Sequence, residues 1–521
     1  MARSRPAPVW LLAAGALVGA AAVLPAAYLA VVVFGDFSAA METALSSRAL
    51  ETLLRTAALT AAVVVASVAL ALPIGWLTVR TDLPGRRLWA VLCTLPLVIP
   101  SYVGAYLLVA ALGPKGMVHD ALGIDPPSIY GFFGAWLVLT LFTYPLVLIP
   151  LRATLRRIDP QLEDAARAMG RGPLEVFRTV VLPQLWPVLA AGSLLVALFT
   201  ISDFGAVSIL RFDSFTAEIY IAYQSSFDRV AAAALGAVLV VAMLGLLFAS
   251  SRVRSSRRVH RLGPGTLRPT RPYRLGRWRW PALGFCSLVV LVAFVLPVGV
   301  LVYWASKGIS TGSTSWNTIA ALGGNSLLIA VWAAAAGAIA ALVVAALVVR
   351  HPSRMTRAIE RLSHAGYALP GILVALGLVF FATRAVPALY QTIALLVFAM
   401  SIHYLPLAIG PTASSLVQLS PRIEEAARGM GRGPAEVFRT ITIPLARGGV
   451  MAGAALVFLH AMKELTVTLI LAPIGFKTLA TDIWTQTTFG FYEASAIPAL
   501  VLLAVAAVPV YLLSEQGAAP P

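Results

Sequence analysis

The chain has 521 residues, of which 59% are hydrophobic, and its mean hydropathy is +0.87. This composition excludes an ordinary soluble protein and predicts a polytopic membrane protein embedded in the lipid bilayer. The formal net charge of +17 does not indicate nucleic acid as a partner, because the basic residues flank apolar stretches in a pattern typical of membrane orientation.

Twelve apolar stretches are long enough to cross a bilayer, which takes about 20 residues of helix. The predicted fold class is therefore an all-α polytopic membrane protein with about 12 transmembrane helices. The approximate ranges are 9–34, 52–79, 88–112, 129–150, 188–210, 231–250, 281–304, 325–349, 363–383, 391–411, 449–472 and 494–513.

The basic residues are distributed unevenly around these stretches. If the amino terminus is cytoplasmic, 30 of the 39 Lys and Arg residues precede the first stretch or lie in inner loops. By the positive-inside rule, both termini are then cytoplasmic. Arg3 and Arg5 before an apolar run would also suit a signal peptide, but the run extends to Phe34 and its removal would invert the charge pattern of every later loop.

One 21-residue stretch occurs twice, at residues 163–183 and 424–444, and the copies share 15 identities at a constant offset of 261. A duplication of two homologous six-helix halves explains this repeat. The predicted organisation is a first half at 1–250 with its loop at 159–183, a basic cytoplasmic linker at 251–280, and a second half at 281–521 with its loop at 420–444. Ten arginines lie in the linker, where we expect them to meet anionic lipid headgroups.

Each copy of the repeat predicts a short helix, a sharp break and a second helix. Asp159 and Ser420 are suited to cap the first helix, and each is followed by proline, which favours the first helical position. Gly170 and Gly431 offer the left-handed conformation that commonly ends a helix.

In the first predicted helix of each copy, apolar residues recur at the spacing of an α-helix. Glu163 and Arg167, like Glu424 and Arg428, have the i, i+4 spacing of an ion pair. We expect these pairs opposite an apolar face. The residues that form this face are Leu162, Ala165, Ala166 and Met169 in the first copy and Ile423, Ala426, Ala427 and Met430 in the second.

The repeat resembles the EAA loop of ATP-binding-cassette importer permeases, which reads EAA, three residues, Gly, nine residues and Ile-x-Leu-Pro. The first copy matches from Asp164 to Gly170 and on to Val180 and Leu182-Pro183, and the second from Glu425 to Gly431 and on to Ile441 and Ile443-Pro444. The departures are Asp164 for Glu, Val180 for Ile and Ile443 for Leu.

The resemblance implies a type I importer permease of the bacterial plasma (inner) membrane. Two copies of a separate ATPase subunit would bind ATP and Mg, an extracytoplasmic binding protein would deliver the cargo, and this chain would bind no cofactor and catalyse no reaction. The absence of a G-x-x-x-x-G-K-[ST] motif agrees with a separate ATPase. The implied coupling residues are Glu163, Asp164, Ala165, Ala166 and Gly170, with Glu424, Glu425, Ala426, Ala427 and Gly431.

Segments after each EAA loop make the resemblance more specific, because they resemble one group of importer permeases. Residues 202–207 (SDFGAV) and 463–468 (KELTVT) look like the fifth-span segments of ferric-iron permeases. Permeases for thiamine, phosphonates, polyamines and sulfate share this architecture and remain alternatives. A secondary transporter of twelve spans is a more distant alternative, which the EAA loops argue against.

Ionisable residues within apolar stretches suggest a translocation pathway. Asp203 and Glu464 occupy equivalent positions in the two halves and would suit Fe³⁺, a hard cation that favours oxygen ligands. Tyr144 directly precedes Pro145, and His403 and Tyr404 precede Pro406. These prolines suggest helix breaks along the same pathway. Helix packing explains Asp203 or Glu464 alone equally well, whereas the matched pair favours a lining role. For Tyr144, His403 and Tyr404, each taken singly, helix packing is the favoured interpretation, and the pattern identifies no metal site.

Overall fold

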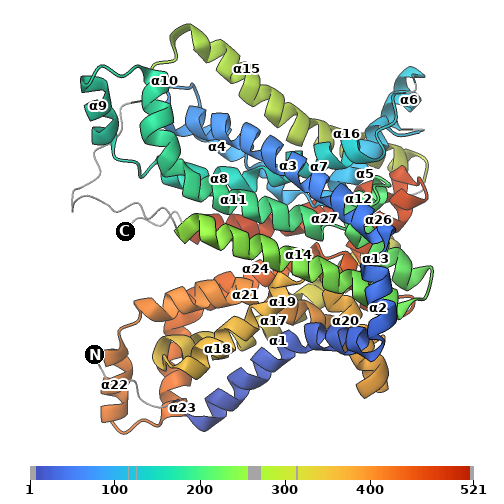
Figure 1. Cartoon of the computed structure of the whole chain (residues 1–521), viewed down its shortest axis with the longest axis vertical. Helices are drawn as coiled ribbons and strands as arrows, with labels where there is room; N and C mark the ends of the chain where they lie inside the picture. Colours follow the sequence, from blue (N-terminus) through green and yellow to red (C-terminus); the bar gives the residue numbers. More distant parts are fainter. Residues whose placement is uncertain (1–6, 115, 125, 256–271, 313–314, 517–521) are drawn as a thin grey trace. The chain divides into compact units, whose positions relative to one another are not determined.

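In a computed structural model, the chain is helical, with one isolated β-bridge in the described part (Figure 1). The structure describes residues 7–516 except 115, 125, 256–271 and 313–314. Most of the predicted linker therefore lies outside the described residues. Cys93 and Cys286 are buried free thiols.

Within the described residues, nine helical segments are long and apolar enough to cross a membrane. Two bent helix pairs raise this number to eleven if each is one span, with bends of 92° and 104°. The nine segments are Val9–Gly35, Ser47–Arg80, Phe132–Leu155, Phe177–Ser202, Arg229–Phe248, Gly276–Ser310, Trp316–Arg350, Ile393–Gln418 and Phe438–Met462, and the pairs are Arg86–Val98 with Ser101–Leu122 and Arg354–Tyr367 with Gly371–Ala385. The last predicted stretch lies in α27 (Tyr492–Gln516).

The helices form two compact units. One contains residues 1–43, 222–237 and 311–521, and the other contains residues 44–221 and 238–310. In the second of these, α3 (Ser47–Arg80) packs on α7 (Phe132–Thr143), α8 (Pro145–Leu155) and α11 (Leu182–Ser202). This helix group carries the first copy of the repeat.

The other unit is built around α17 (Trp316–Arg350), α21 (Ile393–Gln418) and α24 (Ile443–Met462), which contact one another pairwise. Helix α1 (Val9–Gly35) packs on α20 (Gly371–Ala385) and α18 (Arg354–Ser363) in this unit. Conversely, α16 (Leu296–Ser310), which follows the linker, packs on α5 (Ser101–Leu112). The compact units thus exchange the first helix of each sequence half.

Close packing of α1 on α20 depends on a glycine. A Cβ built on Gly377 would lie 2.2 Å from the Pro25 carbonyl oxygen, whereas one on Gly410 in α21 would meet nothing within 4 Å. We expect Gly377→Ala to destabilise the protein by about 1–3 kcal/mol through overpacking. Gly410→Ala should be neutral or stabilising because alanine favours helix.

Thermal unfolding of the two purified variants in detergent tests this packing. Equal melting temperatures would contradict the contact between α1 and α20.

Candidate functional site: the repeated loops and the buried carboxylates

The first copy of the repeat folds as predicted into two helices separated by a glycine. Helix α9 (Pro160–Ala168) begins after Asp159, whose carboxylate accepts a hydrogen bond from the Gln161 N–H at 3.0 Å. Gly170 has φ +82°, in the left-handed region that favours glycine. Helix α10 (Pro173–Val176) then leads through the π turn η2 (Phe177–Val181) into α11.

The second copy repeats this conformation. Helix α22 (Pro421–Gly429), Gly431 with φ +87°, α23 (Pro434–Val437) and the π turn η6 (Phe438–Thr442) occupy the equivalent positions. Ser420 occupies the N-cap, but its side chain makes no capping hydrogen bond, so that part of the prediction is wrong. In Figure 1, α9 and α22 each lie at an end of the helices that flank them in sequence.

Glu163 is the most buried ionisable residue of the first loop, with 3% of its surface exposed. It pairs with Arg80, the last residue of α3, whose side chain is 2% exposed. The Tyr273 hydroxyl donates to Glu163 Oε2 at 2.5 Å, and Arg167 Nη2 lies 3.4 Å from the same oxygen. The predicted i, i+4 pair is confirmed, but it belongs to a larger buried cluster.

Glu424 makes the equivalent cluster in the second loop. Its Oε1 lies 3.0 Å from Nη2 and 3.1 Å from Nε of Arg350, the last residue of α17. Thr442 Oγ1 donates to the same oxygen at 3.0 Å, and Arg428 Nη2 lies 3.4 Å from Oε2. In both loops, therefore, a buried glutamate joins the short helix to the arginine that ends a long helix.

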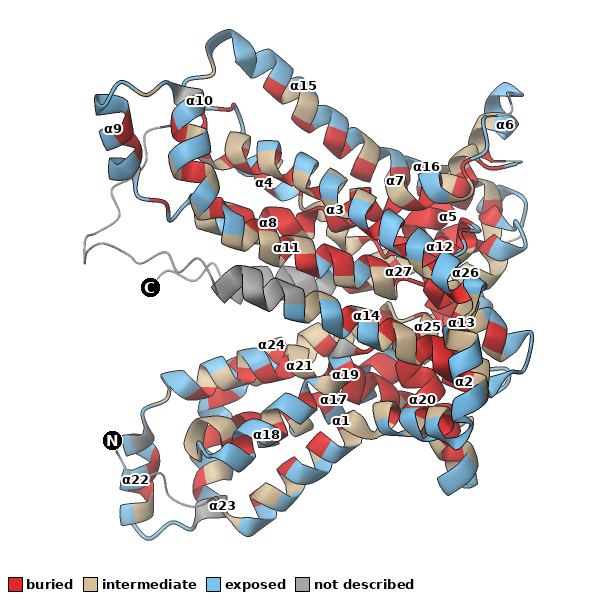
Figure 2. Cartoon of the chain, viewed as in Figure 1, coloured by how far each residue is buried: buried red, intermediate tan, exposed pale blue. Residues whose placement is uncertain are grey.

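These clusters correct the predicted orientation of α9 and α22. Glu163 lies on the buried face with Ala166, whereas Leu162 and Met169 are 45% and 69% exposed. The buried charge cluster, rather than the apolar period, determines which face is inward. The second loop follows the same pattern, with Ala427 buried and Ile423 and Met430 exposed at 46% and 74%. Figure 2 shows both helices as mostly exposed, each with a buried stripe.

The remaining predicted coupling residues are at the surface. Ala165, Asp164, Ala426 and Glu425 are exposed. Among the ion pairs of the described residues, the one partner of Asp164 is Arg167, whose Nη1 lies 3.5 Å from Oδ1. Both residues belong to α9. Each loop thus presents a mixed apolar and acidic surface away from its own helices.

Asp203 lies where α11 ends, not within a continuous helix. Its ψ of 129° is extended, and its Oδ1 accepts from the N–H of Ala206 at 2.9 Å, at the start of α12 (Gly205–Ile209). The Ser101 hydroxyl donates to Oδ2. The carboxylate caps a new helix, and this local bond explains why the span breaks here.

Glu464 makes the same kind of break in the other half. It lies between α24 and α25 (Thr466–Leu471), and its Oε1 accepts from the Val467 N–H at 2.9 Å. The Tyr404 hydroxyl donates to Oε2. The structure therefore pairs Glu464 with a tyrosine.

The other pathway candidates bind backbone groups. The buried Tyr144 hydroxyl donates to the Cys93 carbonyl at 2.6 Å, and His403 Nδ1 lies 2.9 Å from the Gly366 carbonyl oxygen. The expected helix break after Tyr404 is wrong, because α21 continues through Pro406. The chain is interrupted at Tyr144, between α7 and α8.

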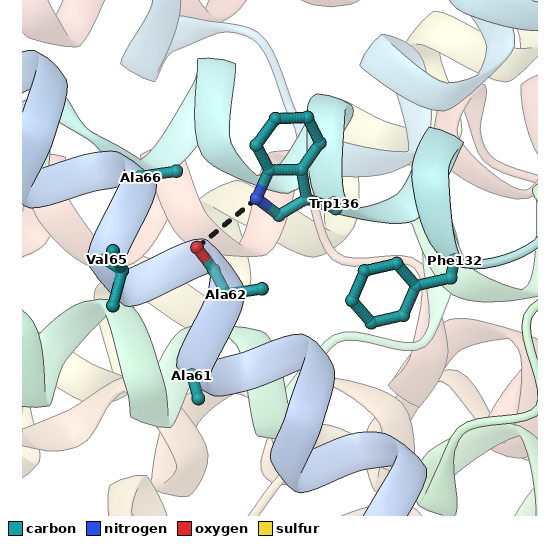
Figure 3. Close-up of a pocket in the computed structure, with 6 residues that line it drawn as sticks. All are labelled: Ala61, Ala62, Val65, Ala66, Phe132 and Trp136. Atoms are coloured by element: carbon teal, nitrogen blue, oxygen red, sulfur yellow. Dashed lines mark hydrogen bonds between the residues drawn. The ribbon is translucent and has the colours of Figure 1, made fainter.

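A surface pocket of about 600 Å³ lies between α3 and α7 (Figure 3). The Trp136 indole donates to the Ala62 carbonyl at 3.2 Å beside it. The six lining residues carry no ionisable group, so they offer no ligand for a metal ion: Ala61, Ala62, Val65, Ala66, Phe132 and Trp136. Across the residues described, no group of three His, Cys, Asp or Glu side chains could hold a metal ion.

Sequence reasoning missed Arg80 and Arg350. Each directly follows a long apolar stretch, and positive-inside counting treats such a residue as one more orientation signal. Each arginine follows the second apolar stretch of its half, and the two are 270 residues apart. This correspondence could have marked them as a repeated feature. The pattern did not indicate which acidic residue they bind.

The helices and the duplicated loops together define a membrane-embedded transport subunit rather than an enzyme. The chain belongs to the family of binding-protein-dependent transport system inner membrane components, whose model matches residues 67–261 and 333–515. It is thus a multi-pass inner-membrane permease of a binding-protein-dependent ABC importer, a class that works with an ATPase and a binding protein.

Relatives cover different shares of the chain. It is 32% identical to the Fe(3+)-transport system permease protein FbpB 2 of Haemophilus influenzae, over 98% of this chain and 99% of the relative. It is 23% identical to the ferric transport system permease protein FbpB of Actinobacillus pleuropneumoniae, over 79% and 63%. The molybdenum transport system permease protein ModB of Escherichia coli is 34% identical over 27% and 64%.

The buried clusters predict very unequal effects at neighbouring acidic residues. Glu163→Ala would leave Arg80 buried without its countercharge, which costs about 3–5 kcal/mol. Asp164→Ala removes only an exposed pair and should change stability by less than about 1 kcal/mol. The apparent melting temperature of the purified protein measures both.

Two further variants control this comparison. Glu424→Ala and Glu425→Ala should reproduce it in the second loop. Replacing both charges, with Arg80→Met and Glu163→Leu, should recover much of the lost stability because no charge then stays buried alone. Similar losses for Glu163→Ala and Asp164→Ala would contradict the assignment.

Proposed function

We propose that the chain imports ferric iron, delivered by an extracytoplasmic binding protein and driven by two copies of an ATPase subunit. The assignment of iron as the cargo rests on the relative whose name specifies Fe(3+) transport and which aligns with this chain nearly from end to end. The molybdenum permease aligns with only 27% of the chain. Both termini and both loops are cytoplasmic in this proposal, ATP and Mg bind to the ATPases, and no nucleic acid takes part.

The two repeated loops are the proposed attachment points for the ATPases. Their exposed apolar residues support this role, because Met169 and Met430 are at least two-thirds exposed at equivalent positions, and methionine suits adaptable binding surfaces. Asp164 and Glu425 add an exposed carboxylate to each surface. Glu163 and Glu424 have a different role in the proposal: they fix the loops to the chain's own helices.

In this proposal Asp203 and Glu464 contribute negative charge along the iron pathway. Each makes one carboxylate–backbone cap and one bond from a hydroxyl side chain, Ser101 or Tyr404. The caps hold the carboxylates at helix breaks, where backbone groups are also freed from the helical pattern. This arrangement supports a pathway role because non-helical backbone at membrane depth is tolerated where it is buried or lines a cavity.

Loop shape offers a test of coupling with a control two residues away. Alanine at Gly170 must adopt a left-handed conformation that costs about 1–2 kcal/mol, whereas Gly172 has no positive φ and no obstructing atoms. We expect Gly170→Ala to lower iron uptake per ATP hydrolysed about fivefold or more, and Gly172→Ala to leave it unchanged.

The assay uses the complete transporter in vesicles, with labelled iron and the loaded binding protein. Normal coupling in both Gly170→Ala and its counterpart Gly431→Ala would reject the role of these loops.

Charge and capping at the carboxylates can also be separated. Asparagine caps a helix about as well as aspartate, so Asp203→Asn keeps the hydrogen bond from Ala206 and removes the charge. Its NH2 would donate to the Ser101 hydroxyl, which donates to the carboxylate in the structure. We expect Asp203→Asn with Glu464→Gln to abolish ferric uptake while assembly and basal ATP hydrolysis persist. Asp203→Ala removes the cap as well and should also lower thermal stability by about 1 kcal/mol.

Uptake of labelled iron into cells that lack other iron routes measures the effect. Undiminished uptake by the double variant would show that the carboxylates serve only as structural caps. Uptake of a different cargo in place of iron by the wild type would reject the assignment of iron as the cargo.

A further inference from the structure

The end of the linker is built into the first loop. Tyr273 pairs with Thr81 in the isolated parallel β-bridge, in which its N–H donates to the Arg80 carbonyl at 2.8 Å and its carbonyl accepts from the Asp82 N–H at 3.1 Å. The Leu275 N–H then donates to the Asp82 carboxylate at 2.8 Å. Residues 273–275 are therefore fixed to the turn that follows α3.

From this position, Tyr273 reaches the buried charge cluster. Its hydroxyl donates to Glu163, and the Arg167 guanidinium lies 4.7 Å from the centre of its ring. The centre of the Trp76 ring lies 5.5 Å from the centre of the Tyr273 ring. One side chain from the linker thus contacts the buried Glu163 and the more exposed Arg167 of α9, as well as Trp76 of α3, the helix that ends at Arg80.

The second loop is completed differently. The described partners of Glu424 are Arg350, Arg428 and Thr442, which come from α17, α22 and the π turn η6. Thr442 takes the place of a hydroxyl donor, but it belongs to the loop's own segment. The first loop depends on a segment about 110 residues away in sequence, as the Tyr273–Glu163 separation shows.

We propose that residues 273–275 act as a strap on the first coupling loop, with Tyr273 as a positioning residue for transmission of force through α9. This inference rests on the proposed coupling function of the loops. The two loops are then held unequally: the linker contributes to the first, whereas the described contacts of Glu424 come from the second loop itself and from α17. A change in the linker would alter one ATPase attachment and leave the other intact.

Tyr273→Phe tests the strap because it removes the hydroxyl and keeps the ring and the backbone bridge. A hydrogen bond to a charged group is worth enough to change an equilibrium about tenfold or more. We expect amide hydrogen exchange in the peptide 160–172 to rise about tenfold in the assembled transporter. The equivalent peptide 421–433 should not change, and it serves as a control within the same molecule.

Thr442→Val provides the mirror experiment. It should raise exchange in 421–433 and leave 160–172 unchanged. For Tyr273→Phe we also expect transporter assembly and basal ATP hydrolysis to persist while uptake per ATP falls. If Tyr273 only stabilised the fold, uptake per ATP would not fall on its own. Unchanged or equally raised exchange in both peptides would overturn the strap.

The outcomes separate this inference from the proposed function. Selective exchange in 160–172 with normal uptake per ATP would overturn the positioning role of Tyr273. If the proposed coupling function of the loops is wrong, uptake per ATP will be normal in Gly170→Ala and Gly431→Ala, whatever the result for Tyr273→Phe.

Discussion

The buried glutamate–arginine pair in each repeated loop is the interaction on which the loop structure depends. Helices α9 and α22 have nine residues each, well below the length at which a helix is stable alone. Their inward surface is small, with one alanine and one glutamate buried per helix. A buried carboxylate without a countercharge would be unfavourable, so Arg80 and Arg350 determine both that these helices dock and which face they dock with.

The long helices place these arginines. At 1.5 Å per residue, the 34 residues of α3 and the 35 of α17 span about 50 Å, well beyond a hydrocarbon core of about 30 Å. Helices of this length exceed the hydrocarbon core, and the arginines at their ends contact the loop glutamates. Since α3 also packs on α7, α8 and α11, the Glu163–Arg80 pair connects α9 to a helix that contacts much of its unit.

Much of the loop conformation could be predicted from sequence because it depends on local rules: proline at the first turn, glycine at positive φ and i, i+4 spacing. The inward face could not, because periodicity alone treats Leu162 and Met169 as core residues. Their exposure follows from a partner 83 residues away, because Arg80 draws Glu163 to the inward face. The breaks at Asp203 and Glu464 were hidden for a related reason, since both lie inside continuous apolar stretches and only their capping bonds reveal the end of the helix.

Carboxylates therefore have two structural uses in this chain, and the difference between them bears on mechanism. Glu163 and Glu424 bind arginines and are held by charge, so neutralising them leaves a buried cation. Asp203 and Glu464 accept from a backbone N–H through one oxygen, so an amide oxygen can keep that bond without the charge. The amide NH2 would then donate to the Ser101 or Tyr404 hydroxyl, which donates to the carboxylate in the structure. The membrane-embedded pair can consequently lose its charge with little cost to the fold, and this separation of geometry from charge is what makes transport by these positions open to a direct test.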